Sequence, residues 1–443
     1  MAYGGGYWLP PIQNKTMPGT YMYFSSKARP TNIFGDRGYA AFAMELSWGE
    51  ENQIITVENA DLQKESMQLF GLEYNDERLL PLREALLNAH TIYTYNLKSG
   101  GKKASGTTDD GTLKLIAKYP GTVGNDIKVT IGKNIDNEDR YDVQIKIKEV
   151  LVYEKTVDDL KGLEDNKFIN FSGAVALTPG ITLKGGQDGT TTVTSHTKFL
   201  ELLEAKYINI VAYAGKDDSI KRLYNSYVTR RVAQEGAYFQ GVLYDFKANS
   251  ELIINVKTPA KRDKTAEDTA ELVYFVAGLE AGCAINRTCG SRIYNGELVL
   301  SVEKKQRDLE NSIKSGEFVF HEVDKELRVL ADINSFTDFE VYKNEDFSKN
   351  QTMRVLHQIG NDWSAIFNKY YLDKVQNDDI GRTVLWNDFH NHLTKLGQLR
   401  AITNFESDDL KVELGDTKES VYAQVLICPV FAMNKLYVNV MVE

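Results

Sequence analysis

The chain has 443 residues, well above the size at which a single hydrophobic core stops growing, so several domains are expected. Its hydrophobic fraction of 42% and charged fraction of 26% are ordinary for folded proteins and exclude a largely disordered chain. The net charge of −10 argues against a general phosphate-binding role, because non-specific binding to nucleic acid needs clustered Lys and Arg.

The N-terminal stretch places large apolar side chains between residues that favour an irregular, extended chain. Gly4–Gly6 favours flexibility and Pro10–Pro11 resists helix, whereas Tyr7, Trp8 and Leu9 lie between them. A free tail rarely carries such a group without burying it. Two interpretations follow: the terminus folds onto its own domain, or it is an arm that docks on a neighbouring subunit.

The next segment, which extends to residue 97, mixes predicted strands and helices. Short apolar runs bounded by turn residues indicate strands, and amphipathic spacing indicates helices. The strands are expected over residues 21–24, 38–46, 54–57 and 91–96. The helices are expected over residues 66–70 and 79–89.

The composition changes at residue 98. Residues 98–108 and 185–192 are rich in Gly, Ser and Thr, so both segments are predicted to be linkers. Between them, apolar and polar residues mostly alternate with period two, which indicates a half-buried antiparallel sheet. Its strands are expected over residues 113–117, 127–131, 141–147, 150–153, 168–171 and 181–183. Residues 98–192 are therefore predicted to be a β-rich insertion.

The region from residue 193 to residue 345 alternates predicted helices and strands, which is typical of an α/β domain. The helices are expected over residues 194–204, 217–235, 265–282 and 301–315. The strands are expected over residues 208–213 and 239–244, followed by a hairpin from residues 318–320 and 327–330.

The remainder begins with two long amphipathic helices and ends in strands. The helices are expected over residues 350–374 and 381–401, and the strands over residues 409–414, 421–430 and 435–443. The last strand places Leu436, Val438, Val440 and Val442 on one face and runs to Glu443. Because an unpaired strand edge is a liability, this strand is expected to pair with another segment.

Candidate catalytic and metal-binding residues are few. His390 and His392 lie two positions apart, so on a helix they point to different faces, and they are predicted to be surface histidines. The three cysteines are too few for a disulfide framework and indicate a chain kept in a reducing cytosol. Cys283, Cys289 and Cys428 are predicted to be small buried hydrophobes. No P-loop, nucleophile elbow, zinc-protease, kinase or dinucleotide motif occurs, so no catalytic, cofactor or metal residue is predicted.

Targeting signals are not found in the sequence. Residues 1–11 have neither a basic nor an apolar signal-peptide region, so secretion by a leader is not expected. No apolar run reaches about 18 residues, so no membrane span is predicted. If the protein leaves its cell, release by lysis is expected.

Several motifs, taken in order along nearly the whole chain, resemble the contractile tail sheath family of myophages and R-type bacteriocins, in its Gram-positive type. Each motif is weak alone, and the ordered set is fairly specific. The motifs are Met17–Tyr21 (Pro-Gly-x-Tyr), Lys118–Ile127 (Tyr-Pro-Gly-x-x-Gly-Asn), Ala277–Gly282 with Asn286, Arg328–Thr337 (Asp-x-Asn-Ser), and the terminal strands with Pro429 and Tyr437–Val440.

This resemblance, with the pattern of elements, implies an α+β or α/β multidomain chain with mixed sheets, an inserted antiparallel β domain, and extended N- and C-terminal arms. The expected divisions are an N-terminal arm over 1–18, the first part of the core over 19–97, the outermost inserted domain over 98–192, a middle α/β domain over 193–345, a tube-facing α/β domain over 346–433 and a C-terminal strand arm over 434–443.

The resemblance also implies a structural function and no enzymatic activity or cofactor. Subunits of this family stack as six-fold rings around an inner tube and contract to drive the tube through a bacterial envelope. The implied partners are further copies of the chain, the tube protein, and baseplate and tail terminator proteins, without direct nucleic-acid contact or membrane insertion. Assembly is expected in the cytoplasm of a bacterial host, as part of a virion tail or a released tail-like particle.

Two sets of residues are candidates for these contacts. The arms are expected to reach neighbouring subunits through Tyr7, Trp8, Leu9, Leu436, Tyr437, Val438, Val440 and Val442. The tube-facing candidates are the helix cations Arg354, Lys369, Lys374, Arg382, Lys395 and Arg400. For the cations, the alternative interpretation is an ordinary solvated helix face.

Two other classes of function remain open from the sequence. A surface- or carbohydrate-binding adhesin would use the β-rich segment 98–192 as its binding domain. A hydrolase built on the α/β domain is a more distant third, because no catalytic motif supports it.

Overall fold

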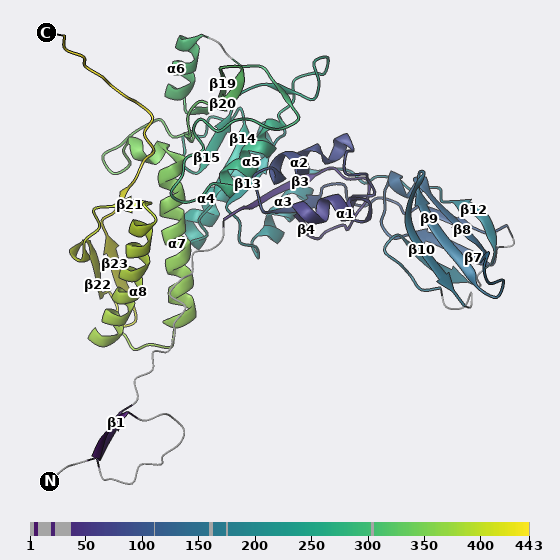
Figure 1. Ribbon diagram of the computed structural model, residues 1–443, viewed down its shortest axis with the longest axis horizontal. Coiled ribbons are helices and arrows are strands. Elements are labelled where there is room, and N and C mark those ends of the chain that lie inside the picture. The colour runs from purple at the N-terminus through teal and green to yellow at the C-terminus, as the bar shows by residue number, and fades with distance from the viewer. Residues whose placement is uncertain are drawn as a thin grey trace.

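The computed structural model describes residues 4–7, 19–22, 37–109, 111–158, 163–173, 176–302 and 305–442. Figure 1 shows an elongated molecule with a central α/β body, a β domain at one end and a helical lobe at the other. The C-terminal segment leaves the helical lobe as an extended chain.

A seven-stranded sheet forms the centre of the body. Its strands, in spatial order, are β18 (Glu317–Phe318), β15 (Ile253–Val256), β14 (Gln240–Tyr244), β13 (Ile210–Tyr213), β3 (Tyr39–Met44), β5 (Thr91–Asn96) and β4 (Ile55–Glu58). All neighbours are parallel except β4 and β5. The β13–β3 pairing joins segments that lie on either side of the β-rich insertion.

Helices cover both faces of this sheet, as expected for parallel strands buried on two sides. They are α1 (Asn59–Phe70), α2 (Leu80–Leu86), α3 (Val193–Leu203), α4 (Asp218–Glu235) and α5 (Leu272–Gly282). Helix α5 packs on β13, β3 and β14 and also on α2. Its contact with α2 requires glycine, because a Cβ at Gly278 would lie 2.0 Å from the carbonyl oxygen of Ala85.

The inserted domain is a sandwich of two antiparallel sheets. One sheet has the order β10 (Val150–Val157), β9 (Tyr141–Ile147), β8 (Ile127–Lys133), β12 (Thr178–Thr182). The other has the order β11 (Ile169–Gly173), β7 (Leu113–Ala117), β6 (Ser105–Thr107). Alternate residues of β7, β8 and β9 are buried, which confirms the predicted period of two.

The C-terminal lobe is built on two long helices and short strands. Its elements are α7 (Asn350–Tyr370), α8 (Asp379–Gln398), β21 (Ile402–Thr403), β22 (Leu410–Leu414), β23 (Val421–Val425) and β24 (Cys428–Pro429). Trp363 of α7 stacks on Phe389 of α8 with ring centroids 4.0 Å apart. The strands β22 and β23 form a hairpin, and β21 pairs with β24.

The other described elements are short. They are β1 (Gly4–Tyr7), β2 (Gly19–Met22), β16 (Ala260–Lys261), β17 (Val299–Leu300), α6 (Gln306–Lys314), β19 (Phe320–Val323), β20 (Glu326–Val329) and the 3₁₀ helices Glu77–Leu79, Thr122–Asp126, Glu345–Ser348 and Ser407–Asp409. Strands β19 and β20 form the predicted hairpin. No helix among the described residues is long and apolar enough to cross a membrane.

Two expectations about these elements were wrong, and one strand was not foreseen. The helix expected over 265–282 begins only at Leu272, and the buried strand β15 was not foreseen. Residues 435–442 are extended without a strand partner among the described residues, so the strand expected there, with its partner in another subunit, stays a prediction. Residues 98–108 and 185–192 are not free linkers, since they pair with each other.

Candidate assembly interface

The C-terminal arm, of which residues 434–442 are described, is an apolar segment whose described side-chain hydrogen bonds to the body lie at its root. Gln351 at the start of α7 is buried; its Nε2 donates to the carbonyl oxygen of Val430 at 2.7 Å, and its Oε1 accepts from the N–H of Ala432 at 3.4 Å. Beyond this clamp the chain extends away from the body (Figure 1). The arm therefore starts at a fixed point and reaches outwards.

The predicted contact residues of this arm are exposed. The exposed fractions are 86% for Leu436, 87% for Tyr437, 69% for Val438, 78% for Val440 and 91% for Val442. Burying side chains of this kind stabilises a complex by about 1.5–3 kcal/mol each. The arm thus has both the apolar side chains and the open backbone groups that strand addition to another sheet requires.

The N-terminal candidates are described only in part. Strand β1, which ends at Tyr7, pairs in parallel with β2, from Gly4 opposite Gly19 to Tyr7 opposite Met22. Trp8 and Leu9 lie outside the described residues. The role of these three residues stays a prediction.

Arg354 does not face a partner, which corrects the expectation from the sequence. Its side chain is 1% exposed and lies between two acidic residues. Nη1 donates to Oε2 of Glu280 on α5 at 2.5 Å, and Nη2 donates to Oδ2 of Asp332 at 2.5 Å. A charge buried in ion pairs within its own chain is not available to a tube protein.

This buried cluster joins the C-terminal lobe to the central body. Asn350, also on α7, donates from Nδ2 to Oδ1 of Asp332 at 3.0 Å. The N–H of Cys289 donates to Oδ2 of Asp332 at 2.9 Å, and Arg354 Nη2 also reaches the carbonyl oxygen of Arg287 at 3.0 Å. Helix α7 is therefore fixed to the loops that follow α5 and β20.

The two carboxyl groups of the cluster have opposite pKa shifts. Burial raises the pKa of Glu280 well above its usual value, and the charge of Asp332 raises it further. Burial also disfavours the charged form of Asp332, but Arg354 and several hydrogen bonds outweigh it and lower that pKa to about 2. Asp332 is therefore the anion that pairs with Arg354, and Glu280 holds a proton more readily.

The cluster also resembles a small metal site, since ligand atoms of Glu280, Cys289 and Asp332 lie within 4.8 Å of one another. The guanidinium of Arg354 already contacts both carboxylates. A bound cation would have to displace this charge and leave it buried, which is strongly unfavourable. The geometry therefore favours an ion-pair cluster over a metal centre.

The other five helix cations lie nearer to solvent. Lys369, Lys374 and Arg400 are exposed, whereas Arg382 and Lys395 are partly buried. Lys374 Nζ donates to the carbonyl oxygen of Lys369 at 2.6 Å, and Lys369 Nζ lies 5.3 Å from the centroid of the Tyr370 ring. The contact of these five residues with a tube stays a prediction.

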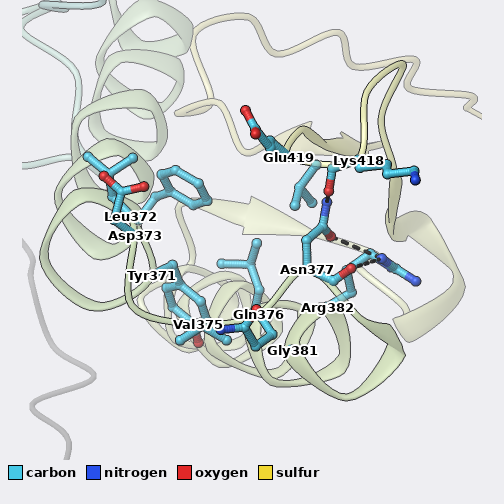
Figure 2. Close-up of a pocket in the computed structure, with 13 residues that line it drawn as sticks. Tyr371, Leu372, Asp373, Val375, Gln376, Asn377, Gly381, Arg382, Lys418 and Glu419 are labelled. Atoms are coloured by element: carbon cyan, nitrogen blue, oxygen red, sulfur yellow. Dashed lines mark hydrogen bonds between the residues drawn. The ribbon is translucent and has the colours of Figure 1, made fainter.

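A pocket of about 330 Å³ lies where α7 ends and α8 begins, beside the β22–β23 hairpin (Figure 2). Arg382 lines it and donates from Nη1 to the backbone carbonyl and the Oδ1 of Asn377, at 3.1 and 3.0 Å. Asn377 in turn donates to the carbonyl oxygen of Lys418 at 2.9 Å. Arg382 therefore ties the interhelical turn together.

A polar joint fixes the β domain to the central body. Asp188 Oδ2 accepts from Lys98 Nζ at 2.9 Å and from Ser47 Oγ at 2.8 Å. Its Oδ1 accepts from the N–H of Thr122 at 2.8 Å. The two segments that join the β domain to the body, residues 98–108 and 185–192, also pair with each other. A Cβ at Gly189 would lie only 2.2 Å from the backbone oxygen of Ser99 in the opposite segment. The glycines predicted to give flexibility instead permit close contact.

The lowered pKa of Asp188 makes the stability of this joint depend on pH. Burial raises its pKa, but Lys98, Thr122 and Ser47 lower it more, from 3.8 to about 2. A lowered carboxyl pKa stabilises the fold above the unfolded value, so this contribution is lost as the pH falls from about 3.8 to about 2.

Replacing Asp188 with asparagine is expected to lower the free energy of unfolding at pH 7 by about 2 kcal/mol, because charge-assisted hydrogen bonds are lost. Urea denaturation measures this effect, and proteolysis within residues 98–104 should become faster. Asp158→Asn is the matched control, since that side chain is 80% exposed in its pair with Arg140. Equal stability of the two variants would contradict the joint.

The burial of two side chains, His392 and Cys428, differs from the sequence prediction. His392 is not on the surface: it is buried, its Nε2 lies 2.8 Å from Asp362 Oδ2, and Trp363 Nε1 donates to its Nδ1 at 3.3 Å. Cys428, on strand β24, is exposed, whereas Cys283 and Cys289 are buried as predicted.

Comparison with known protein families gives four adjacent matches. The tail sheath protein Gp18 domain III N-terminal region matches residues 37–97, and the phage tail sheath beta-sandwich domain matches residues 99–188. The phage tail sheath central domain matches residues 189–335, and the phage tail sheath C-terminal domain matches residues 342–443. The matches follow the order of the body, sandwich and lobe described above.

Whole-chain relatives agree with these matches. The chain is 31% identical to the uncharacterized protein YqbK of Bacillus subtilis, over 98% of each chain. It is 32% identical to the sheath tail protein of Desulfitobacterium hafniense, with a TM-score of 0.81 over 95% of this chain and 99% of that one. The helical sheath of the anti-feeding prophage in its contracted state shares the fold, with 11% identity and a TM-score of 0.57 over 96% and 99%.

The fold and the exposed arm define a structural subunit of a phage-tail type. This chain belongs to the phage tail sheath family, and relatives from the Gram-positive bacteria Bacillus subtilis and Desulfitobacterium hafniense match it over nearly its whole length. The predicted resemblance and the predicted multidomain fold are thereby confirmed.

Proposed function

We propose that this chain polymerises as stacked six-fold rings around an inner tube and contracts to drive that tube through a bacterial envelope. The observation that carries the proposal is the C-terminal arm, which exposes its apolar side chains and has no strand partner among the described residues. Membership of the tail sheath family supports the same conclusion.

The arms would link subunits while the bodies move. A strand of about five residues forms four or five backbone hydrogen bonds, each worth about 1 kcal/mol net, in addition to its buried side chains. Such links hold a mesh together while rigid bodies rotate and slide between two packings. Contraction then needs no nucleotide, only an extended state that is metastable against a state with more contact between subunits.

The remaining contacts follow from this arrangement. The N-terminal arm, including Tyr7, Trp8 and Leu9, would reach another subunit, and residues 346–433 would face the tube, with Lys369, Lys374, Arg382, Lys395 and Arg400 as candidates. Residues 98–192 would form the outermost domain. Baseplate and terminator proteins would cap the polymer, which would assemble in the host cytoplasm and leave by lysis as a virion tail or tail-like particle.

The adhesin alternative is not favoured. The segment on which it rested, residues 98–192, corresponds to the β-sandwich domain of the sheath family. The family is structural, which supports a role without enzymatic activity.

Electron microscopy of the purified protein tests the proposal directly. Negative staining is expected to show tubes or rings, either from the protein alone or after co-expression with the proposed tube protein. Image averaging should show six subunits in each ring. A protein that stays monomeric under both conditions would contradict the proposed function.

A further inference from the structure

A tight hairpin ahead of α7 displays large apolar side chains at its tip. The N–H of Glu340 donates to the carbonyl oxygen of Lys343 at 2.9 Å, and the reverse hydrogen bond is 3.2 Å long. The two residues between them, Val341 and Tyr342, are 94% and 92% exposed, and Phe339 is 51% exposed. Residues 339–343 are called the knob below.

The base of the knob is firmly held, so its shape does not depend on a partner. Oδ1 of Asn249 accepts from the N–H groups of Thr337 and Asp338 at 2.9 and 3.1 Å, and its Nδ2 donates to Oδ2 of Asp338 at 2.8 Å. At the other side, Lys343 Nζ pairs with Oε1 of Glu251 at 2.5 Å. The tip is presented from a preorganised base, which lowers the entropy cost of binding.

The residues at the tip contradict local preference. Turn positions normally carry Gly, Pro, Asn, Asp or Ser, because these residues suit the backbone and tolerate water. Val341 and Tyr342 are almost fully exposed, so hydrophobic burial within this chain does not stabilise them at these positions. A local rule broken without a gain inside the fold points to a function outside it.

The position of the knob indicates what covers it. The knob is followed directly by the 3₁₀ helix Glu345–Ser348 and by the start of α7 at Asn350. The C-terminal arm leaves the body at the same end of α7, where Gln351 clamps Val430. A neighbouring copy that receives the arm is therefore tethered at the end of the lobe from which the knob projects.

The knob is too small to form a stable interface by itself. Stable complexes bury about 800 Å² on each partner, which three side chains cannot supply. A contact of this size contributes only where another link already holds the two chains together, because the second contact then forms at high effective concentration. The arms supply such a link between copies of this chain.

We propose that the knob is a contact with a second copy of this chain in the assembled sheath, with Val341 and Tyr342 buried in the neighbour. The proposal rests on the proposed function. It adds a surface that acts together with the arms and stabilises the polymer after they have joined the subunits.

The test compares the double variant V341S/Y342S with the wild type. Its monomer is expected to unfold at the same urea concentration, because both side chains are exposed. Its critical concentration for polymer formation should rise at least tenfold. I135S is the matched control, since Ile135 is 96% exposed at a turn of the outer β domain and should leave assembly unchanged.

A photo-crosslinking residue at position 342 identifies the occupant. Polymers should give a crosslinked dimer of this chain, with peptides of both copies found by mass spectrometry. Crosslinks to the tube protein alone would overturn the proposal, as would assembly of V341S/Y342S at the wild-type concentration. A wild type that never polymerises would instead refute the proposed function, and this inference with it.

Discussion

Replacing Arg354 with alanine is expected to lower the free energy of unfolding by about 3–5 kcal/mol. The substitution leaves the carboxylate of Asp332 buried without its guanidinium partner, and it opens a cavity between α7 and the loop after α5. Glu280 loses the same guanidinium partner, so the substitution weakens the contacts of α7 with both α5 and the loop after β20. We expect the C-terminal lobe to separate from the body before the central sheet unfolds.

Urea denaturation followed by circular dichroism measures the loss, and proteolysis between the central body and α7 reports separation of the lobe. Lys369→Ala is the matched control, because it removes one cation from the same helix at an exposed position and should cost less than about 0.5 kcal/mol. If Arg354→Ala unfolds within 1 kcal/mol of the Lys369 variant, the cluster does not hold the lobe in place.

Arg354 also shows what the sequence could not reveal. On an amphipathic helix it is indistinguishable from Lys369 or Arg382, all of which were predicted to face a tube. Its burial depends on Glu280 and Asp332, which lie 74 and 22 positions away in the chain. The only available signal was the acidic residue inside the apolar helix α5, since a buried Glu requires a partner.

The joint at Asp188 shows a different limit of prediction. Gly-rich composition favours a flexible linker, but the same glycines permit the two connecting segments, residues 98–108 and 185–192, to lie in contact. Which outcome occurs depends on Ser47, Thr122 and Lys98, which come from three separate segments. Composition describes the freedom of a segment by itself and not the partners that remove that freedom.

Hydrophobic periodicity predicted the bounds of single elements well, because the pattern of each lies within one segment of the sequence. The strands β7, β8 and β9 were predicted close to their observed bounds, because burial alternates along each of them. The helices α7 and α8 were also predicted close to their observed bounds. Spatial order was not predictable in the same way. The pairing of β3 with β13 joins two segments that the whole inserted domain separates in the sequence.

The second large effect concerns assembly. Deleting residues 434–443 is expected to abolish polymers and to leave a monomer of unchanged stability, because the segment makes no strand contact within the described chain. The lost hydrogen bonds and buried side chains sum to more than 5 kcal/mol, which corresponds to more than a thousandfold in affinity. Deleting residues 1–17 is expected to have the same outcome if the N-terminal arm also docks on a neighbour.

Two point variants separate a specific strand from a merely sticky tail. Val438→Asp places a charge on the predicted apolar face of the arm, whereas Asn439→Asp places the same charge on the opposite face one residue later. Sedimentation velocity and electron microscopy should show monomers for the first variant and polymers for the second. Polymers formed equally well by both variants, or by the protein lacking residues 434–443, would refute strand addition by this arm. Loss of polymers in both variants would mean that the arm is buried on both faces, as a central strand of the neighbour's sheet requires.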